Sequence, residues 1–389
     1  MHVAVIGAGA VGVTAAAELA VAGAGVTVFD RGDPGSGSSG RAAGIVYDAY
    51  AEDIDAELAA RSVEAFRRLS GTGGFEFVDC PYVFLAREGD EQVAEAIAGS
   101  VERMRHHGRD VEVLTADELE RRFGDSLVVD DVAAAAVAHD AGWADPASYV
   151  EMMADRARAA GVEFRTGRAV GLDVDLPGVV VGATVERFDA VLVAAGAHTK
   201  QLFADAGVPV ALKPYRVQAL TSTTPYDGPM CFDASVDVYF RPHSTGLLGG
   251  DGTEPVEADP DDWDREADDW FVEGLGRELD TRADYALDVD RSWAGLCTAT
   301  PDGDPLLGEV VDDVYVAAGW QGHGFMRAPA TAAAVAEEIR GGSGIEPFAP
   351  TRFEGDEAFP IFQGMTVETG KSGESEELEE SGESEESEE

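Results

Sequence analysis

A glycine-rich turn between two apolar runs constrains the fold of this chain more than any other feature. Val3–Ile6 is a short apolar run, and a GxGxxG segment follows it directly. A helical pattern then continues to Ala22, and a second apolar run, Val26–Phe29, ends in Asp30-Arg31. Strand, glycine turn, helix and strand in this order predict a compact βαβ unit at the start of the chain.

Each glycine of this turn has a separate task in a dinucleotide site. Gly7 permits the tight turn, Gly9 lets the backbone approach a pyrophosphate, and Gly12 lets the helix pack closely on the strand. The pyrophosphate would meet the N-terminus of the helix, where Ala10 and Val11 follow Gly9. These residues are therefore our first candidate cofactor-binding positions.

The end of the second apolar run bears on which dinucleotide is bound. Asp30 stands where the fingerprint places a carboxylate for a ribose hydroxyl, which argues against NADP, although Arg31 beside it weakens that argument. No second GxGxxG occurs, which disfavours a chain holding both FAD and NAD domains. The N-terminal position of the motif and the sequence downstream favour FAD.

The rest of the chain mixes helical and strand patterns and becomes richer in strands after Pro214. Residues 32–44 are rich in Gly and Ser and predict a loop. The predicted helices span 51–69, 91–107, 116–122, 146–160, 261–279 and 328–339. The predicted strands span 75–78, 82–85, 162–164, 169–174, 217–221, 236–240 and 314–318, with a buried strand running into a glycine turn over 188–196.

The charge is strongly acidic, at −47 with 28 basic and 75 acidic residues. Ten glutamates lie in Ser372–Glu389, and without them the net charge is still −37. Because molar salt shortens the Debye length to about 3 Å, such a surface suits a high-salt cytoplasm, while an acidic protein of an ordinary cell is the alternative. The same field disfavours nucleic-acid binding. The tail cannot bury apolar surface and is expected to be disordered.

Cysteine use and the N-terminal residues point to the cytoplasm. Cys80, Cys231 and Cys297 are scattered and form no CxxC, which fits a reducing compartment and no structural zinc site. The chain opens directly into the first apolar run without a basic segment or a cleavage signal, so no secretory signal is predicted. The apolar stretch from Val3 to Val28 is interrupted by glycines, so no integral membrane segment is predicted either. We expect no metal site.

Several separated segments together resemble the D-amino-acid-oxidase-like family of FAD-dependent oxidoreductases, the group of glycine oxidase, sarcosine oxidase and amino-acid dehydrogenases. The resemblance covers most of Met1–Gly342. Besides the glycine turn, it rests on the loop 37–45, the turn 193–196, the segment 293–308 and the glycine-rich segment 318–329. By this resemblance, further residues would contact FAD, and they are Ser38, Ser39, Arg41, Ala43, Gly44, Val170, Ala195, Gly196, Gly319, Gly322, Gly324, Phe325 and Met326.

The resemblance also implies an architecture. It predicts an α/β fold in which a Rossmann-type FAD-binding domain carries a second, smaller antiparallel-sheet domain over the substrate face of the flavin. The FAD-binding domain would comprise 1–78, 138–212 and 293–348. The substrate domain would comprise 79–137 and 213–292. A C-terminal extension, 349–389, would end in the acidic tail.

The family reaction implies hydride transfer from a carbon beside nitrogen to flavin N5, so the expected substrate is a small amine or amino acid and the product an imine that water hydrolyses. Oxygen, a quinone or an electron-transfer flavoprotein would then accept the electrons. Two alternatives remain open. One is an FAD-dependent 2-hydroxy-acid dehydrogenase, and the other is an FAD-binding subunit that is inactive without a partner.

The residues that bind the substrate carboxylate in this family appear at none of the corresponding positions, where Cys297, Met326 and Tyr47 stand instead. These differences favour a dehydrogenase over a plain glycine or sarcosine oxidase. Arg241, next to Tyr239 at the end of a predicted strand, is the first candidate cation for an anionic substrate, with a surface or ion-paired arginine as the alternative. His323 would approach the flavin or substrate, or else pack within the glycine loop. These three residues are the candidate catalytic residues.

Overall fold

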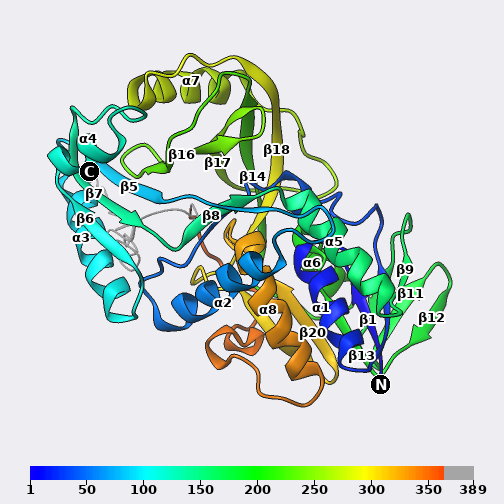
Figure 1. Ribbon diagram of the computed structural model, residues 1–389. Helices are drawn as coiled ribbons and strands as arrows, with labels where there is room; N and C mark the ends of the chain where they lie inside the picture. Colours follow the sequence, from blue (N-terminus) through cyan, green and yellow to red (C-terminus); the bar gives the residue numbers. More distant parts are fainter. Residues whose placement is uncertain (363–389) are drawn as a thin grey trace, which may run out of the picture.

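The computed structural model describes residues 1–362, and two large sheets organise them (Figure 1). The acidic tail lies outside the described residues, so its disorder stays a prediction. In the described part of the C-terminal extension, residues 350–352 form a short 3-10 turn.

The first sheet has six strands in the order β19-β20-β13-β1-β2-β9. All of them run parallel except β19, which lies antiparallel at one edge. Their bounds are β1 His2–Ile6, β2 Gly25–Phe29, β9 Glu163–Arg165, β13 Ala190–Val193, β19 Leu306–Val311 and β20 Val314–Ala318. The helix α1 (Ala10–Val21) joins β1 to β2, so the predicted βαβ unit is confirmed.

Both faces of this sheet are covered, which explains why its strands are continuous apolar runs. Val3 and Val5 of β1 face the core that contains α1, while Ala4 and Ile6 face a second core on the opposite side. That second core includes residues of a small antiparallel sheet and of a short helix. The bounds of these elements are β10 Gly171–Asp173, β11 Gly178–Val181, β12 Thr184–Arg187 and α6 Thr199–Asp205.

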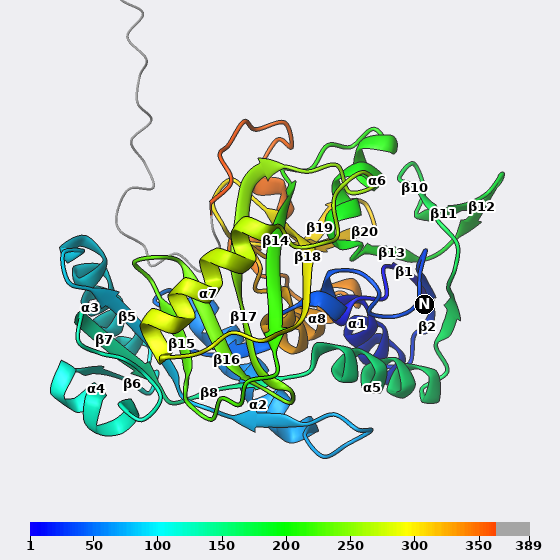
Figure 2. The same cartoon turned by 90° about the horizontal axis from the view of Figure 1, so that it is seen from above.

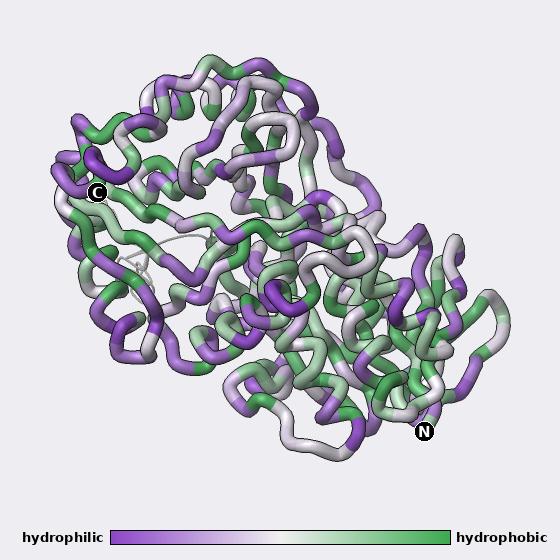
Figure 3. The backbone as a smooth tube through the Cα atoms, viewed as in Figure 1, coloured by the Kyte–Doolittle hydropathy of each residue, from purple (hydrophilic) through white to green (hydrophobic). Residues whose placement is uncertain are grey.

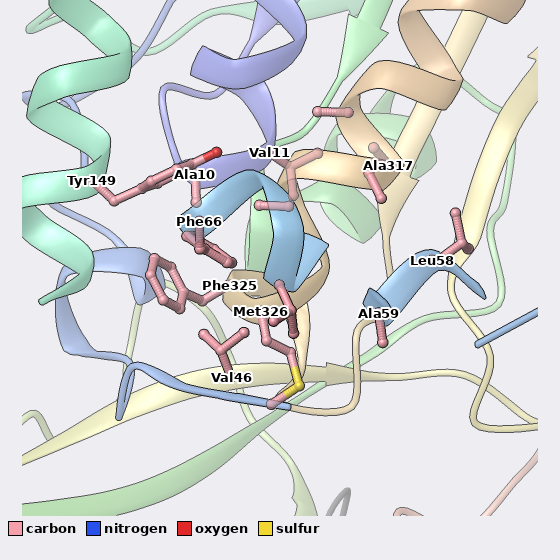
Figure 4. Packing of buried hydrophobic residues seen from close by; sticks show 14 of the residues in the cluster. Ala10, Val11, Val46, Leu58, Ala59, Phe66, Tyr149, Ala317, Phe325 and Met326 are labelled. Atoms are coloured by element: carbon pink, nitrogen blue, oxygen red, sulfur yellow. The ribbon is translucent and has the colours of Figure 1, made fainter. Parts of the chain in front are cut away.

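Three further helices belong to the same core as α1, and their bounds are α2 Asp53–Leu69, α5 Pro146–Ala159 and α8 Gly324–Ile339. Helices α5 and α8 pack on α1, and α2 packs on α8. Phe66 of α2 and Tyr149 of α5 both pack on Phe325 at the start of α8, with ring centroids 5.1 and 5.6 Å from it (Figure 4). Because α8 also packs on α1, the glycine-rich segment before α8 lines the same cavity as the N-terminal glycine turn.

The second sheet has eight strands in the order β18-β14-β17-β16-β15-β5-β7-β6, all antiparallel except for the parallel pair β15 and β5. Their bounds are β5 Tyr82–Arg87, β6 Val111–Leu114, β7 Val132–Ala138, β14 Lys213–Ser222, β15 Met230–Asp233, β16 Val238–His243, β17 Gly246–Glu257 and β18 Val289–Ala299. Two distant regions of the chain therefore build one sheet, and the β15–β5 pairing joins them.

Helices cover this second sheet, and a small sheet lies between it and the first. Figure 2 shows α7 lying across the second sheet. The covering helices are α3 Glu91–His106, α4 Ala116–Phe123 and α7 Asp269–Ala283. The small sheet, in the order β3-β8-β4, consists of β3 Ile45–Tyr47, β4 Phe77–Asp79 and β8 Ala141–Ala144. Hydrophilic residues lie mainly along the outer helices and loops (Figure 3).

Three sequence predictions need correction. The predicted helix over 261–279 begins only at Asp269, because the side chains of Asp259 and Asp264 accept hydrogen bonds from backbone N–H groups two residues on and fold the chain into turns. The last helix begins at Gly324, four residues earlier than predicted, and contains Pro329 near its start. Val170 precedes its strand, which begins at Gly171. The predicted domain boundaries stay a prediction.

Candidate cofactor and substrate site

One cavity of about 730 Å³ opens where the first sheet, the second sheet and the start of α8 meet. The predicted candidates Tyr239 and His323 line it. Nearly all of the predicted FAD positions also line it, namely Gly7, Gly9, Ala10, Val11, Asp30, Arg31, Ser38, Ser39, Arg41, Ala43, Gly44, Val170, Ala195, Gly196, Gly322, Gly324, Phe325 and Met326. Gly12, Gly319 and Arg241 do not line it.

The glycine turn closes tightly enough to exclude a side chain at Gly7 and at Gly12. Gly7 has φ +113°, and a Cβ there would lie 2.2 Å from the carbonyl oxygen of Ala194. A Cβ on Gly12 would lie 2.0 Å from the carbonyl oxygen of Gly7, so Gly12 serves helix packing although it does not line the cavity. A Cβ on Gly9 would meet only the Ser39 hydroxyl, at 3.0 Å, and would project into the space that a cofactor needs.

Asp30 ends β2 at the wall of the cavity and is held by two backbone donors. The N–H of Ala8 donates to its Oδ2 at 2.6 Å, and the N–H of Gly32 donates to its Oδ1 at 2.7 Å. Each carboxylate oxygen can accept a further hydrogen bond, so the group remains able to bind ribose hydroxyls. With the N-terminus of α1 nearby for a pyrophosphate, these residues fit the adenosine diphosphate part of FAD.

The loop 37–45 runs along the cavity, and three hydrogen bonds tie it to the second sheet. The Ser38 hydroxyl donates to the carbonyl of Leu296 at 2.6 Å, and the Trp293 indole N–H donates to the carbonyl of Arg41 at 3.0 Å. The third donor is Arg241, whose Nε bonds the carbonyl of Ala43 at 2.6 Å. Strands β18 and β16 of the second sheet thus fix the loop that leads to the flavin end of the cavity.

Arg241 lies behind this loop, so the geometry differs from the predicted approach to the flavin. Its side chain is 2% exposed, its Nη1 donates to the carbonyl of Pro242 at 2.6 Å, and its guanidinium lies 4.7 Å above the ring of Trp143. Burial lowers the pKa of Arg241 to about 10. In the part of the chain that the structure describes, it forms no ion pair.

His323 lies at the opposite wall, just before α8, and is 8% exposed. Its Nε2 is buried and has no hydrogen-bond partner among the described residues. Its ring meets Tyr47 and Tyr50 edge-on, with centroids 6.3 and 5.9 Å apart. Burial, and then the nearby Arg327 guanidinium, lowers the pKa of His323 to about 3. The imidazole is therefore neutral at physiological pH.

Arg327 has a structural role beneath His323. Its Nη1 lies 2.5 Å from a carboxylate oxygen of the buried Asp55, and its guanidinium lies 4.5 Å above the ring of Tyr50. The Tyr50 hydroxyl in turn donates to the sulfur of Met326 at 3.0 Å. These contacts hold the start of α8, with His323 and Met326, against the cavity.

Four arginines line the cavity. Arg31 and Arg168 lie next to Asp30, whereas Arg41 and Arg265 do not. Arg31 pairs with a carboxylate, and Arg168 donates its backbone N–H to the carbonyl of Asp30. Arg41 and Arg265 lie beside β18, where their carbonyls accept hydrogen bonds from Trp293 and Ala294. Within the described residues neither forms an ion pair.

These two arginines lie near a third cation, Arg291. Burial, and then the Arg265 and Arg291 guanidinium groups, lowers the pKa of Arg41. Arg265 and the neighbouring Trp263 were not predicted as site residues, because the acidic stretch around them was interpreted as a helix. No local motif in that stretch distinguishes a cavity-lining arginine from an exposed helical one.

Residues 1–362, which the structure describes, contain no group of three or more His, Cys, Asp or Glu side chains placed to hold a metal ion. Nor do they include a helix that combines the length and apolarity needed to cross a bilayer.

Comparison with known proteins gives relatives of one kind. Residues 2–338 match the family described as FAD dependent oxidoreductase. A glycine oxidase from Bacillus licheniformis is 28% identical over 387 residues, covering 91% of this chain and 95% of that protein. A D-amino-acid oxidase from Bradyrhizobium diazoefficiens is 30% identical over 226 residues, covering 54% of this chain and 52% of that protein.

Solved structures share the whole arrangement. L-proline dehydrogenase from P. horikoshii superposes with a TM-score of 0.83 at 29% identity, covering 91% of this chain and 97% of that one. Glycine oxidase from Geobacillus kaustophilus superposes with a TM-score of 0.79 at 24% identity, covering 90% and 98%. The predicted α/β fold and the predicted FAD cofactor are confirmed. The chain belongs to the FAD-dependent oxidoreductase family and is an enzyme of the amino-acid or amine oxidase type.

Proposed function

We propose that this enzyme oxidises a small amine or amino acid at the carbon beside nitrogen. FAD supplies the hydride acceptor, N5 of its isoalloxazine, and the protein supplies binding, orientation and electrostatics. The observation that carries the proposal is that Ala43 and Gly44, which the resemblance assigns to the flavin, line one cavity together with the segment from Gly322 to Met326. A neutral His323 and the aromatic residues Tyr239 and Trp293 line the same cavity.

The chain's own residues can support this reaction without a strong base. The substrate binds as the neutral amine, and its nitrogen lone pair drives loss of the hydride. The iminium product then adds water and breaks down to a carbonyl compound and an amine or ammonia. His323 stays uncharged in its buried setting, so it does not repel the positive charge that develops on nitrogen.

Arg41 and Arg265 replace Arg241 as our candidates for a substrate carboxylate. Both line the cavity, and both lack an ion-pair partner among the described residues. A chain with 75 acidic residues offers many carboxylates, so two unpaired guanidinium groups at a cavity wall favour an anionic ligand there. The acceptor would be oxygen, a quinone or an electron-transfer flavoprotein, with a dehydrogenase favoured.

An anaerobic visible spectrum of the holoenzyme tests this function. Amines, amino acids, amino-acid amides and 2-hydroxy acids are added one at a time, and products are assayed for carbonyl compound and ammonia. We expect an amino acid to bleach the oxidised flavin band with release of amine or ammonia, and Arg265→Gln to slow bleaching by the amino acid more than by its amide. Bleaching by hydroxy acids alone would contradict amine oxidation.

The electron acceptor is measured in the same cuvette. After bleaching, air, a soluble quinone or an electron-transfer flavoprotein is added and the return of the oxidised band is timed. We expect the quinone or the flavoprotein to restore the band faster than air. A band that no compound bleaches would contradict the proposal and favour a subunit that needs a partner.

A further inference from the structure

One wall of the cofactor cavity comes from a segment without helix or strand, residues 258–268, which we call the crossover segment. It leaves the second sheet after β17 and ends where α7 begins. Pro260, Asp261, Trp263 and Arg265 of this segment line the cavity. The second sheet therefore reaches across the cavity to the side where the first sheet binds the dinucleotide.

The base of the crossover segment is fixed to the second sheet. Arg216 of β14 is 7% exposed, and its Nε donates to the carbonyl of Asp264 at 3.0 Å. Its Nη2 donates to the carbonyl of Glu266, and its Nη1 lies 2.6 Å from a carboxylate oxygen of Asp268. The Gln218 side chain also accepts a hydrogen bond from the N–H of Asp268, at 2.7 Å. Buried, multiply bonded groups of this kind hold their position firmly.

The tip of the segment contacts the residues that follow β2 and β13 through a single side chain. Asp261 Oδ1 lies 2.7 Å from Arg31 Nη1 and 3.2 Å from His198 Nε2. Arg31 follows Asp30 at the end of β2, and His198 follows Gly196 after β13, so both flank the adenosine part of the cavity. Asp261 thus joins the ends of two parallel strands across the cofactor site.

This tip contact is of a weak kind. The side chains of Asp261, Arg31 and His198 are 68%, 48% and 25% exposed. Exposed ion pairs contribute little and are screened by salt. A firmly held base with a weakly held tip is the arrangement of a clasp that opens and recloses without unfolding of either sheet.

We propose that Asp261 is the clasp residue of the FAD site: its contacts with Arg31 and His198 close the adenosine end, and their opening limits how fast FAD enters and leaves. The cofactor itself is shown by the family, so this inference does not depend on the substrate proposed above. If a residue limits exchange, its substitution raises the association rate and the dissociation rate of FAD together, because an open tip eases passage in both directions. If a residue merely binds FAD, its substitution raises the dissociation rate and weakens the affinity.

The test is an exchange experiment on the holoenzyme of Asp261→Asn, which removes the charge and keeps the side-chain size. Holoenzyme is mixed with excess isotopically labelled FAD, and the bound label is followed by mass spectrometry after desalting. Association is timed separately by quenching of FAD fluorescence on the apoprotein. We expect both rates to rise about tenfold, in keeping with the loss of the carboxylate that Arg31 and His198 both contact, while the dissociation constant changes less than either rate.

Asp155→Asn is the matched control. Asp155 pairs with Arg158 on α5 at 2.8 Å, with side chains 70% and 48% exposed, which closely matches the Asp261–Arg31 pair, and it does not line the cavity. Its FAD exchange should equal that of the wild type. Salt gives a second readout: between 0.1 and 1 M KCl, wild-type exchange should accelerate more than exchange in Asp261→Asn.

Two outcomes would overturn the proposal. Equal exchange rates in Asp261→Asn, Asp155→Asn and the wild type would show that the tip does not limit passage. Faster dissociation with unchanged association would make Asp261 a static binding contact. Neither readout uses a substrate, so failure here is distinguishable from failure of the proposed reaction.

Discussion

At the scale of single residues, the protonation states of His323 and its neighbour Arg327 are set by their buried surroundings. His323 has an ordinary histidine side chain, yet its buried position and the nearby Arg327 lower its pKa to about 3. Arg327 itself keeps its charge, because Tyr50 and Asp55 surround its guanidinium. A neutral imidazole and a charged guanidinium therefore lie close together, because of these two groups only the Arg327 guanidinium has a carboxylate partner within the described residues, Asp55.

His323→Asn is predicted to change how stability depends on pH. Since the pKa of His323 is lower in the folded state than its ordinary value of 6.5, only the unfolded state takes up the proton between these values. The stability that this residue contributes is fully present above pH 6.5 and is lost as the pH falls. From pH 7.5 to 5, the wild type should lose about 2 kcal/mol relative to His323→Asn in urea unfolding.

The exposed His106 supplies the control for that measurement. The difference in unfolding free energy between the wild type and His106→Asn should change far less over the same pH range. A difference that stays constant for His323→Asn as well would mean that His323 is protonated inside the fold, which contradicts its neutral role.

At the scale of elements, the flavin end of the site depends on contacts between the two sheets. The loop 37–45 belongs to the first sheet by sequence, but β16 and β18 of the second sheet hold it through Arg241 and Trp293. Ile45, the last residue of this loop, pairs with Trp143 of β8, and the Arg241 guanidinium lies above the Trp143 ring. The end of the loop is therefore fixed both by strand pairing and by the residues around Trp143. Arg241 therefore acts as a positioning residue in this geometry.

Arg241→Met is predicted to loosen this loop. Methionine can still pack on Trp143, but the carbonyls of Ala43 and Pro242 lose their donor. An unsatisfied buried carbonyl costs about 1–3 kcal/mol, so we expect a loss of about that size in unfolding free energy, together with a changed visible circular dichroism of the bound flavin. Arg241→Lys should restore part of the unfolding free energy and part of the circular dichroism signal.

Arg291→Met is the matched control, since Arg291 is exposed and lies 4.6 Å above the ring of Trp293. Its effect on stability should stay within about 0.5 kcal/mol. If Arg241→Met instead keeps its stability and flavin spectrum but loses turnover of a carboxylate substrate, the positioning role fails. The first prediction, a substrate-binding Arg241, would then be correct.

At the scale of the whole molecule, charge is the dominant property. We propose that the net charge of −47 is an adaptation to high salt, in which screening removes the repulsion between carboxylates. The melting temperature should then rise by more than about 4 °C between 0.1 and 3 M KCl, the shift that about 3 kcal/mol gives a chain of 389 residues.

Deletion of Ser372–Glu389 should leave most of this rise, because the remaining chain still carries a charge of −37. NaCl at the same ionic strength screens charge equally and should reproduce the rise. A melting temperature that is independent of KCl would contradict the adaptation and favour an acidic protein of an ordinary cell.

The sequence by itself determined the first βαβ unit and most of the residues around the cofactor. Gly7, Gly9, Gly12 and Asp30 act through backbone geometry within one local unit, so their spacing along the chain already carries the information. The segment before α8 was found in the same way, because its glycines leave a recognisable pattern.

Only the tertiary structure decided the position of Arg241 behind the loop, the cavity-lining Arg265 and the bridging role of Asp261. Each depends on contacts between residues far apart in the chain, such as the 230 positions that separate Arg31 from Asp261. The sequence around a charged residue shows the same pattern whether its side chain faces solvent, a backbone carbonyl or a cavity. The packing of the two sheets against each other makes that choice, and no single stretch of sequence contains it.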